Sequence, residues 1–326
     1  MRILLTGASG FVGSHILDVL CQRGLPTATL LRPSSNRKFL EPHLAKVEVR
    51  IGVIDDPGSL REAMRGITHV IHCAGATKAV SRAGFFEVNQ LGTRNVVSAV
   101  NATAGGVQRL VHVSSLAAAG PALPAKPARE EDVPTPVSDY GRSKLAGENE
   151  VREQCRAGYV ILRPPAVYGP RDAEFLRLFT TVKRHFLPLP SNSQALSLVY
   201  VRDLATAVVN CLEHPAAAGK TFFVSGREVV TARQMAQEIA KQMQVWTLPL
   251  PLPRVLLWPV CLAQEIVTRL TRRPNVLSLQ KYAELSAPGW VCDGARLERE
   301  VGVICPTTLA SGVGATLEWY QQHRWL

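Results

Sequence analysis

Short apolar runs alternate with helical patterns through the first half of the chain. Asp56 followed by Pro57 fits a helix start, with Asp as the N-cap and Pro at the first helical position. Alternating strands and helices are typical of βαβ units, so the pattern predicts an α/β fold with a doubly wound parallel sheet covered on both faces. The expected elements are strand 3–6, helix 12–22, strand 27–31, strand 47–51, helix 60–65, strand 70–72 and strand 110–114.

From about Pro164 the chain has more proline and longer irregular stretches, around 186–190 and 248–253. A clear helix is predicted over 231–243, because its first residues have the spacing of a capping box and apolar residues recur on one face. We expect residues 1–165 to form the sheet domain, to which a later segment near 196–212 returns. Residues 166–326 should form a smaller, mostly helical region that covers the substrate.

Three glycines follow the first strand and open the first helix, at positions 7, 10 and 13. Gly7 permits a tight turn, Gly10 lets a phosphate approach the backbone, and Gly13 lets the helix pack against the strand. A helix N-terminus reached in this way presents backbone N–H groups to a pyrophosphate. The turn therefore predicts a dinucleotide site, with a tight turn that binds no ligand as the alternative.

The residues about twenty positions further on indicate which dinucleotide is bound. Enzymes that use NAD carry an acidic residue there for the ribose hydroxyls, whereas this chain has Arg32 and no acid over 30–38. A guanidinium would form a charge-assisted pair with a 2′-phosphate. We predict NADP as the preferred cofactor and NAD as the alternative. The other interpretation of Arg32 is a solvated residue at a strand end.

Two further motifs supply candidate chemistry. Tyr140 and Lys144 are four residues apart, so on a helix they share one face, and the ammonium could lower the pKa of the phenol toward neutrality. Ser115 follows the predicted strand 109–113, where its hydroxyl could hold a substrate carbonyl oxygen. The order of glycine turn, serine strand and Tyr-Lys helix predicts hydride transfer, with Tyr140 moving the proton.

Together these motifs resemble the extended short-chain dehydrogenase/reductases of the NAD-dependent epimerase/dehydratase superfamily. The pattern is most similar to 3β-hydroxysteroid dehydrogenase and dihydroflavonol reductase-like members, and the resemblance covers nearly the whole chain. It is carried by Thr6 to Gly13, His72 to Gly75, Val88 to Thr93, Val113 to Ser115, Tyr140 to Lys144, Leu162 to Pro170 and Val199 to Ala205.

The resemblance implies a Rossmann fold and a role for each matching position. Ser115, Tyr140 and Lys144 would form the catalytic triad, and Lys144 would also bind the nicotinamide ribose. Asn89 would lie near the site as a strut rather than as a reactant. The residues implied to bind the cofactor are Thr6, Gly7, Gly10, Phe11, Val12, Gly13, Arg32, Ile54, Ala74, Lys144, Pro164 and Val167.

Departures from the family pattern narrow the substrate. Gly52-Val53-Ile54 replaces a triplet whose Asp binds the adenine amino group, so that contact must be lost or made by backbone. Leu116 and Ala117 stand where dehydratases of this family have carboxylates. Ala166 and Ser197-Leu198 stand where nucleotide-sugar epimerases have an Asn and an Arg.

We therefore predict an NADP-preferring oxidoreductase that acts on a ketone or secondary alcohol of a fairly apolar small molecule, of steroid, flavonoid or keto-acyl type. The alternative enzyme is an NAD-dependent nucleotide-sugar epimerase. The alternative from another class is a catalytically silent protein that binds and senses NADP.

Composition adds limits on location and partners. The 326 residues are 46% hydrophobic, and no apolar run reaches the roughly 18 residues of a membrane span. The seven cysteines form no CxxC pair, so we expect reduced thiols in a cytoplasmic protein and no metal site. The net charge of +11 comes from scattered residues, and no nucleic-acid-binding signature is present. A homodimer would be usual for the resembled family.

The most apolar stretch, 246–262, is followed by Arg269, Arg272 and Arg273. It can be interpreted as a cover for a hydrophobic substrate or as a helix that packs between domains. A third interpretation is a peripheral membrane contact through 246–273, since an apolar face beside arginines suits an anionic lipid surface.

Overall fold

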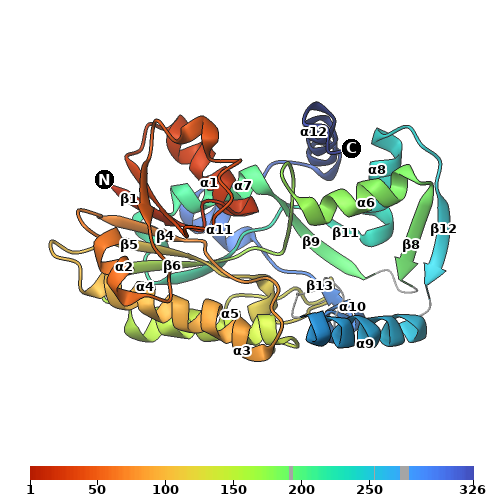
Figure 1. Ribbon diagram of the computed structural model, residues 1–326. Coiled ribbons are helices and arrows are strands. Elements are labelled where there is room, and N and C mark those ends of the chain that lie inside the picture. Colours follow the sequence, from red (N-terminus) through yellow and green to blue (C-terminus); the bar gives the residue numbers. More distant parts are fainter. Residues whose placement is uncertain (191–193, 253, 272–278) are drawn as a thin grey trace.

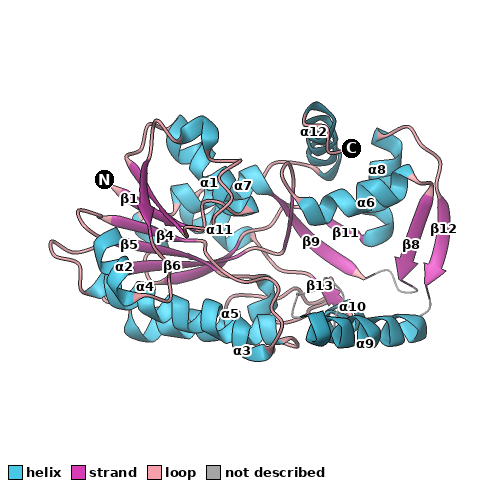
Figure 2. Ribbon diagram, viewed as in Figure 1, coloured by secondary structure: helices cyan, strands magenta, loops and turns pink. Residues whose placement is uncertain are grey.

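A seven-stranded, all-parallel sheet forms the larger lobe of the molecule (Figures 1 and 2). The computed structural model describes residues 1–190, 194–252, 254–271 and 279–326. The doubly wound fold predicted from the sequence is confirmed. In spatial order the strands are β10 (Lys220–Phe223), β6 (Gly158–Arg163), β5 (Arg109–Val113), β4 (His69–His72), β1 (Ile3–Thr6), β2 (Thr27–Leu31) and β3 (Glu48–Ile51).

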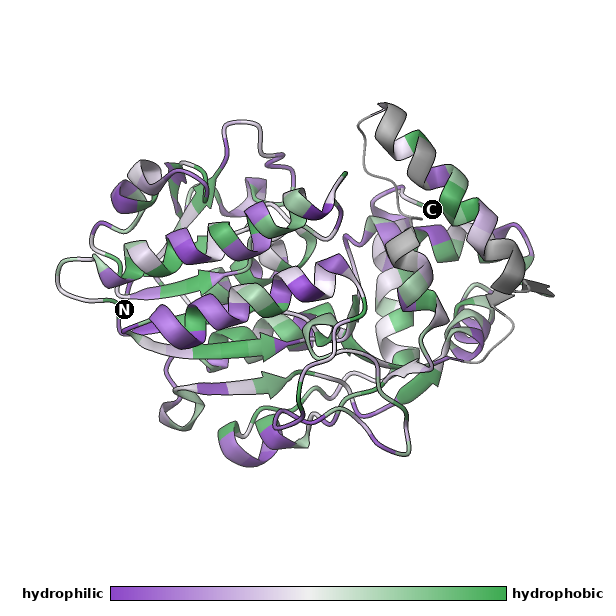
Figure 3. Ribbon diagram, turned by 90° about the horizontal axis from the view of Figure 1, so that it is seen from below, coloured by the Kyte–Doolittle hydropathy of each residue, from purple (hydrophilic) through white to green (hydrophobic). Residues whose placement is uncertain are grey.

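Helices cover both faces of this sheet, and each face has its own apolar core. Leu17 and Leu204 belong to the core on one face, whereas Val97 and Val151 belong to the core on the other. Figure 3 shows the strands as hydrophobic ribbons behind helices of mixed polarity. The helices of the first face are α1 (Phe11–Gln22), α7 (Val201–Asn210) and α11 (Ala295–Val301), and those of the second are α2 (Pro57–Ala63), α4 (Gly92–Asn101) and α5 (Asp139–Gln154).

The predicted local signals are present in these elements. The Asp56 carboxylate accepts hydrogen bonds from the N–H groups of Gly58 and Ser59 and so caps α2. Helix α8 (Ala232–Gln242) begins with a complete capping box between Thr231 and Gln234.

The chain returns to the larger lobe in two steps. Helix α7, within the expected segment 196–212, packs on α1, and the later strand β10 pairs with β6 and forms the edge of the large sheet. Strand β9 (Ala195–Tyr200) belongs instead to the smaller lobe. Sheet membership depends on pairing between distant segments, which hydrophobic periodicity does not encode.

The smaller lobe is built around β9. It pairs with β11 (Val229–Thr231) in antiparallel register and with β7 (Ala166–Tyr168) and β13 (Gly289–Trp290) in parallel register. Buried Phe179 and Tyr320 lie in its core. The remaining elements of the described chain, in both lobes, are α3 (Arg82–Phe86), α6 (Ala173–Lys183), α9 (Arg254–Thr271), α10 (Leu279–Ser286), α12 (Leu309–Gln322) and the short helical turns Glu41–His43, Glu87–Leu91, Leu116–Ala118 and Pro215–Ala217.

The two proline-rich stretches expected to be irregular pair with each other. Strands β8 (Phe186–Pro190) and β12 (Leu248–Leu252) form a two-stranded parallel ribbon, and Pro253 lies outside the described residues. Proline is tolerated there because both strands of such a ribbon are edge strands. No helix of the described segments is long and apolar enough to cross a membrane.

The packing of α1 against β1 depends on a missing side chain. A Cβ on Gly13 would lie 2.0 Å from the Gly7 carbonyl oxygen, a backbone atom that cannot rotate away. The first turn of α1 can therefore approach the end of β1 only with glycine at this position.

We expect Gly13→Ala to lower the free energy of unfolding by about 1–3 kcal/mol, the usual cost of overpacking a tight contact. Chemical denaturation would measure it. Gly314→Ala in α12 is the matched control, because its added Cβ would make ordinary contacts at 3.5 Å or more. The control should be neutral or stabilising by up to about 1 kcal/mol. Equal effects of the two substitutions would contradict this account of the turn.

Candidate active site

The glycine turn has the geometry of a backbone cradle at a helix N-terminus. Gly7 has a φ of 79°, and a Cβ there would lie 2.6 Å from the backbone nitrogen of Ala74. The Gly10 N–H donates to the Gly7 carbonyl at 3.0 Å, and Gly10 is the N-cap residue of α1. A side chain at either glycine would occupy the cradle. Because glycine has none, the backbone there stays accessible to a ligand.

A cavity of about 520 Å³ opens over this turn, beside β1, β2 and β4. Its volume and its glycine cradle fit a dinucleotide, so the residues present suit the cofactor predicted from the sequence. Six of the predicted cofactor residues line it: Thr6, Gly7, Gly10, Arg32, Ile54 and Ala74. The remaining lining residues, which were not predicted from the sequence as cofactor-binding residues, are Ser9, Leu30, Ser35, Gly52, Val53, Asp55, Cys73, Gly75, Ala76, Glu87 and Val88.

Other predicted cofactor residues support the cavity from outside. The Phe11 ring packs edge-on against His15, and Val12 packs against the core under α1. Pro164 is buried, and its carbonyl accepts the N–H of Leu116 at 2.8 Å. Val167 packs against the same core as Val12. The described cavity does not reach these side chains.

The rim of the cavity next to β2 carries a cation and a hydroxyl. Arg32 is exposed and lines the cavity, and the Ser35 N–H donates to its carbonyl at 2.9 Å, which closes a turn. This turn places the Arg32 guanidinium and the Ser35 hydroxyl on one side of the site. Both groups are suited to a phosphate.

The structure places an acidic residue, Asp55, close to the position at which the family triplet has its Asp. The Ser59 hydroxyl bonds both the N–H and the carbonyl of Val53, and the Ile54 carbonyl accepts from Asn95 at 3.0 Å. Asp55 is exposed and lines the same cavity. The sequence carried a weak signal for it, since Asp55 lies two positions after the place where the family has its acid.

Ser115 and Tyr140 meet at the carboxyl end of β5. The Ser115 hydroxyl oxygen accepts the N–H of Ala117 at 3.1 Å, which caps the turn Leu116–Ala118. Tyr140 lies in the first turn of α5, and the ring of Phe85 packs 6.1 Å from its ring centre. The phenol is hydrogen-bonded to Ser115.

Burial raises the pKa of Tyr140 to about 12, and the hydrogen bond to Ser115 opposes this shift only in part. The nearby charge of Glu284 on α10 raises the pKa further, so the smaller lobe reaches the catalytic end of the sheet. The sequence had predicted a pKa lowered by Lys144. That prediction was wrong for this structure, because the ammonium is bonded elsewhere and desolvation of the phenolate dominates.

Lys144 lies one turn after Tyr140 and is only 5% exposed. Its Nζ donates to the Val113 carbonyl at 2.7 Å. Burial lowers the pKa of this ammonium to about 8. A Cβ on the cavity-lining Gly75 would lie 3.7 Å from Nζ, so Lys144 stands directly behind the cavity wall.

Asn89 is a strut, as the resemblance implied. Its side-chain amide pairs with the N–H and the carbonyl of Ala76 at 2.8 and 3.0 Å, and it also donates to the Ser143 hydroxyl at 2.9 Å. The amide therefore fastens the cavity loop to α5, the helix that carries Tyr140 and Lys144.

The positions at which the chain departs from related enzymes carry no acid. Leu116 and Ala117 form the turn after Ser115, and Ala166 is exposed at the start of β7. The Ser197 hydroxyl accepts the N–H of Cys292 at 3.1 Å and is buried. All seven cysteines are free thiols, and no group of His, Cys, Asp or Glu in the described ranges is arranged to hold a metal ion.

Comparison with known proteins agrees with this geometry. Ceramide reductase of Caulobacter vibrioides is 31% identical over 99% of this chain and 96% of its own length. UDP-glucose 4-epimerase of Vibrio cholerae is 31% identical over 77% of this chain and 79% of its own length. The structure of UDP-glucose 4-epimerase from Thermus thermophilus in complex with NAD superposes with a TM-score of 0.77, at 25% identity, over 98% of this chain and 99% of that one.

The model of the NAD dependent epimerase/dehydratase family matches residues 3–225. This range contains the glycine turn, the dinucleotide cavity and the Ser115, Tyr140 and Lys144 side chains. The chain therefore belongs to the NAD dependent epimerase/dehydratase family and is an enzyme of the extended short-chain dehydrogenase/reductase type.

Proposed function

We propose that this chain is an NADP-preferring oxidoreductase that reduces a ketone of a fairly apolar small molecule, or oxidises the matching secondary alcohol. The observation that carries the proposal is the hydrogen-bonded pair of Ser115 and Tyr140, which stands beside Lys144 at the wall of the dinucleotide cavity.

The residues divide into those that hold the cofactor and those that handle the carbonyl. Backbone at Gly7 and Gly10 would hold the pyrophosphate, and Lys144 the nicotinamide ribose. When bound there, the nicotinamide supplies or accepts the hydride. A carbonyl oxygen that replaces the mutual hydrogen bond of Ser115 and Tyr140 would accept the protons of both hydroxyls, while the Ser115 oxygen still accepts the Ala117 N–H.

Tyr140 then moves the proton. With a pKa raised to about 12, its phenol is protonated at neutral pH and ready to donate to the oxygen that gains negative charge during reduction. The opposite direction requires the phenolate, which burial disfavours.

The choice of NADP is supported by Arg32 and Ser35, which share the cavity rim, and by the absence of an acid over residues 30–38. A guanidinium and a hydroxyl complement a 2′-phosphate, whereas a carboxylate would repel it.

An apolar substrate is supported by two observations. Ala166, Leu116 and Ala117 lack the polar side chains that nucleotide-sugar enzymes of this family use. Ceramide reductase, a relative whose name gives a lipid substrate, matches this chain over nearly its full length. A long-chain keto lipid is therefore the first compound to assay, followed by steroid, flavonoid and β-keto compounds.

A nucleotide-sugar epimerase is the second candidate, because UDP-glucose 4-epimerases are among the relatives. Such an enzyme retains NAD and shows no net redox turnover. The nucleotide released from the purified protein on denaturation separates the two functions.

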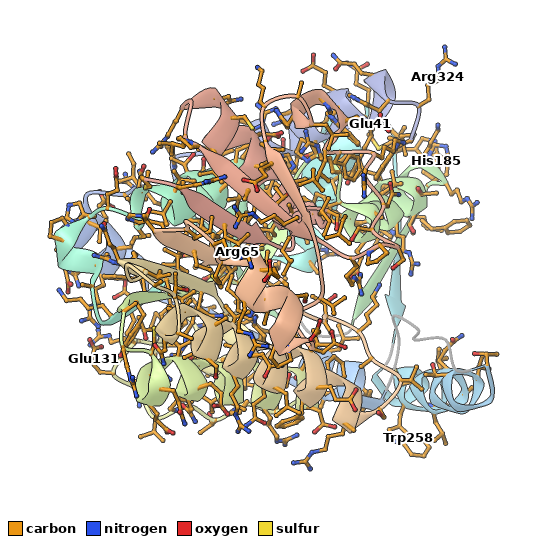
Figure 4. All side chains as sticks on the ribbon, turned by 60° about the vertical axis from the view of Figure 1, so that its left-hand side comes forward. Glu41, Arg65, Glu131, His185, Trp258 and Arg324 are labelled. Carbon is orange, nitrogen blue, oxygen red and sulfur yellow. The ribbon has the colours of Figure 1, made fainter. Side chains whose placement is uncertain are left out.

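We also propose that α9 meets a lipid surface. Trp258, Val260 and Val267 are exposed at 43–48%, whereas Cys261 and Thr268, two turns apart, are buried on the side that packs on α10. Figure 4 shows Trp258 pointing from α9 away from the rest of the molecule. The side chain of Arg269 and residues 272–273 lie outside the described parts of the structure. A cytoplasmic location and a homodimer remain predictions.

Tyr140→Phe should lower kcat for ketone reduction by about 10²–10⁴, because it removes the proton donor but little of the cofactor site. Steady-state assays with NADPH would measure it. Tyr159→Phe is the control. Tyr159 lies near the start of β6, at the end of the sheet opposite to the active site, and packs against the apolar core there. Full activity of Tyr140→Phe would refute the assignment of Tyr140 as the proton donor.

In the unmodified enzyme, reductive kcat/KM should be level below pH 8. It should fall as the pH rises through about 8, where Lys144 loses its proton.

Arg32→Ala should weaken NADPH binding by about tenfold or more and leave NADH binding nearly unchanged, because only NADPH carries the phosphate that the guanidinium would hold. Fluorescence titration of both nucleotides would measure this without a substrate. Arg61→Ala on the exposed face of α2 controls for the loss of one surface charge. Equal losses of NADPH and NADH affinity would refute the assignment of Arg32.

The protein should sediment with sucrose-loaded vesicles that contain phosphatidylglycerol, and less with phosphatidylcholine vesicles, because its net charge is +11. Trp258→Asp and Val260→Asp should release it. Val133→Asp is the matched control, since Val133 is 83% exposed in the loop before α5. Absence of binding to either vesicle would leave α9 as a packing helix or a substrate cover.

A further inference from the structure

A buried carboxylate ties together three segments that carry active-site residues. Glu148 is fully buried on α5, one turn after Lys144. It accepts a hydrogen bond of 2.5 Å from the Ser114 hydroxyl at the end of β5. It also accepts two from Arg163 at the end of β6, at 2.9 and 2.7 Å, and one of 2.7 Å from Arg152.

Two of the three partners of Glu148 adjoin residues of the site. Ser114 precedes Ser115, and Arg163 precedes Pro164, whose carbonyl accepts the Leu116 N–H on the far side of Ser115. Glu148 itself shares a helix face with Lys144, four residues earlier. One carboxylate therefore fixes the distance between the strand end that carries Ser115 and the helix that carries Tyr140 and Lys144.

The charges of the cluster keep Glu148 ionised and paired with Arg163. Arg163 is 1% exposed and pairs with Glu148, which is its counter-ion. Its remaining nitrogen, Nη1, has no hydrogen-bond partner among the residues that the structure describes. Burial raises the pKa of Glu148, but the hydrogen bonds and charge of Arg163 outweigh this effect, and the net shift is downward. The carboxylate is thus charged at neutral pH. Its charge also raises the pKa of Lys144 against the effect of burial.

We propose that Glu148 is a positioning residue for the reaction, which sets the placement of Ser115 relative to Tyr140 and Lys144 through Ser114 and Arg163. This inference rests on the proposed function for its activity assay, but the geometry it invokes belongs to the family site and holds for either enzyme candidate.

Glu150→Gln is a closely matched control for Glu148→Gln. Glu150 lies two residues later on α5, is also buried, and forms a two-pronged pair with Arg94 at 2.7 and 3.0 Å. It also accepts from Gln90, so its partners lie on α4 and the turn before it, away from the ends of β5 and β6. The two variants remove the same kind of interaction from the same helix.

We expect Glu148→Gln to lower kcat about 10- to 100-fold with little change in NADPH affinity, because displaced groups slow the reaction more than they weaken binding. The midpoint of the fall in reductive kcat/KM with pH should move down by about one unit, since the charge that holds the proton on Lys144 is gone. Glu150→Gln should show neither change. An unchanged kcat and pH midpoint in Glu148→Gln, or equal changes in both variants, would overturn the proposal.

The double variant Glu148→Gln/Arg163→Met guards against misfolding, because it removes the stranded cation together with its counter-ion. It should regain thermal stability but not the pH midpoint or kcat. Recovery of all three would assign Glu148 a purely structural role.

Amide NMR spectra of the cofactor-free protein give a readout that needs no substrate. The Ser115 and Lys144 signals should shift in Glu148→Gln and not in Glu150→Gln. If the unmodified enzyme epimerises a nucleotide sugar instead, the proposed function fails, and the same variants test Glu148 with that substrate.

Discussion

The close approach of α1 to the ends of β1 and β4 is the constraint on which the rest of the site depends. It requires no side chain at Gly7 and Gly13, where a Cβ would collide with backbone of Ala74 and of Gly7 itself. This approach places the N-terminus of α1 beside the cavity, and the first N–H groups of a helix have no intrahelical acceptor. The cofactor cavity exists because these atoms are so close, and the positions of Arg32 and Asp55 on its rim follow from the neighbouring parallel strands.

Desolvation governs the chemistry at the other end of the cavity. Tyr140 is kept protonated and Lys144 is brought to a pKa of about 8, both mainly through burial. The fold must stabilise these groups in an apolar environment, and it does so with fixed partners, the Val113 carbonyl for Lys144 and Ser115 for Tyr140. A buried charge is costly without such partners. The active site is therefore held rigidly at the point where β5, β6 and α5 meet.

The same framework serves reductases and epimerases, because both need a nicotinamide beside a Tyr-Lys pair. The positions that resemble the carboxylates and the Asn of related enzymes hold Leu116, Ala117 and Ala166 in this chain, and Leu116 is itself buried. Exposed aromatic and aliphatic residues of α9 add apolar surface to the smaller lobe.

The sequence alone determined the features that depend on local physics. Steric demands at Gly7, Gly10 and Gly13, the one-turn spacing of Tyr140 and Lys144, and the periodicity of strands and helices are all written in neighbouring residues. Only the tertiary structure decided that β10 completes the large sheet, that Asp55 and Cys73 line the cofactor cavity, and that the pKa of Tyr140 rises instead of falling. Strand pairing, cavity lining and desolvation arise between segments far apart in the chain, and no local pattern encodes them.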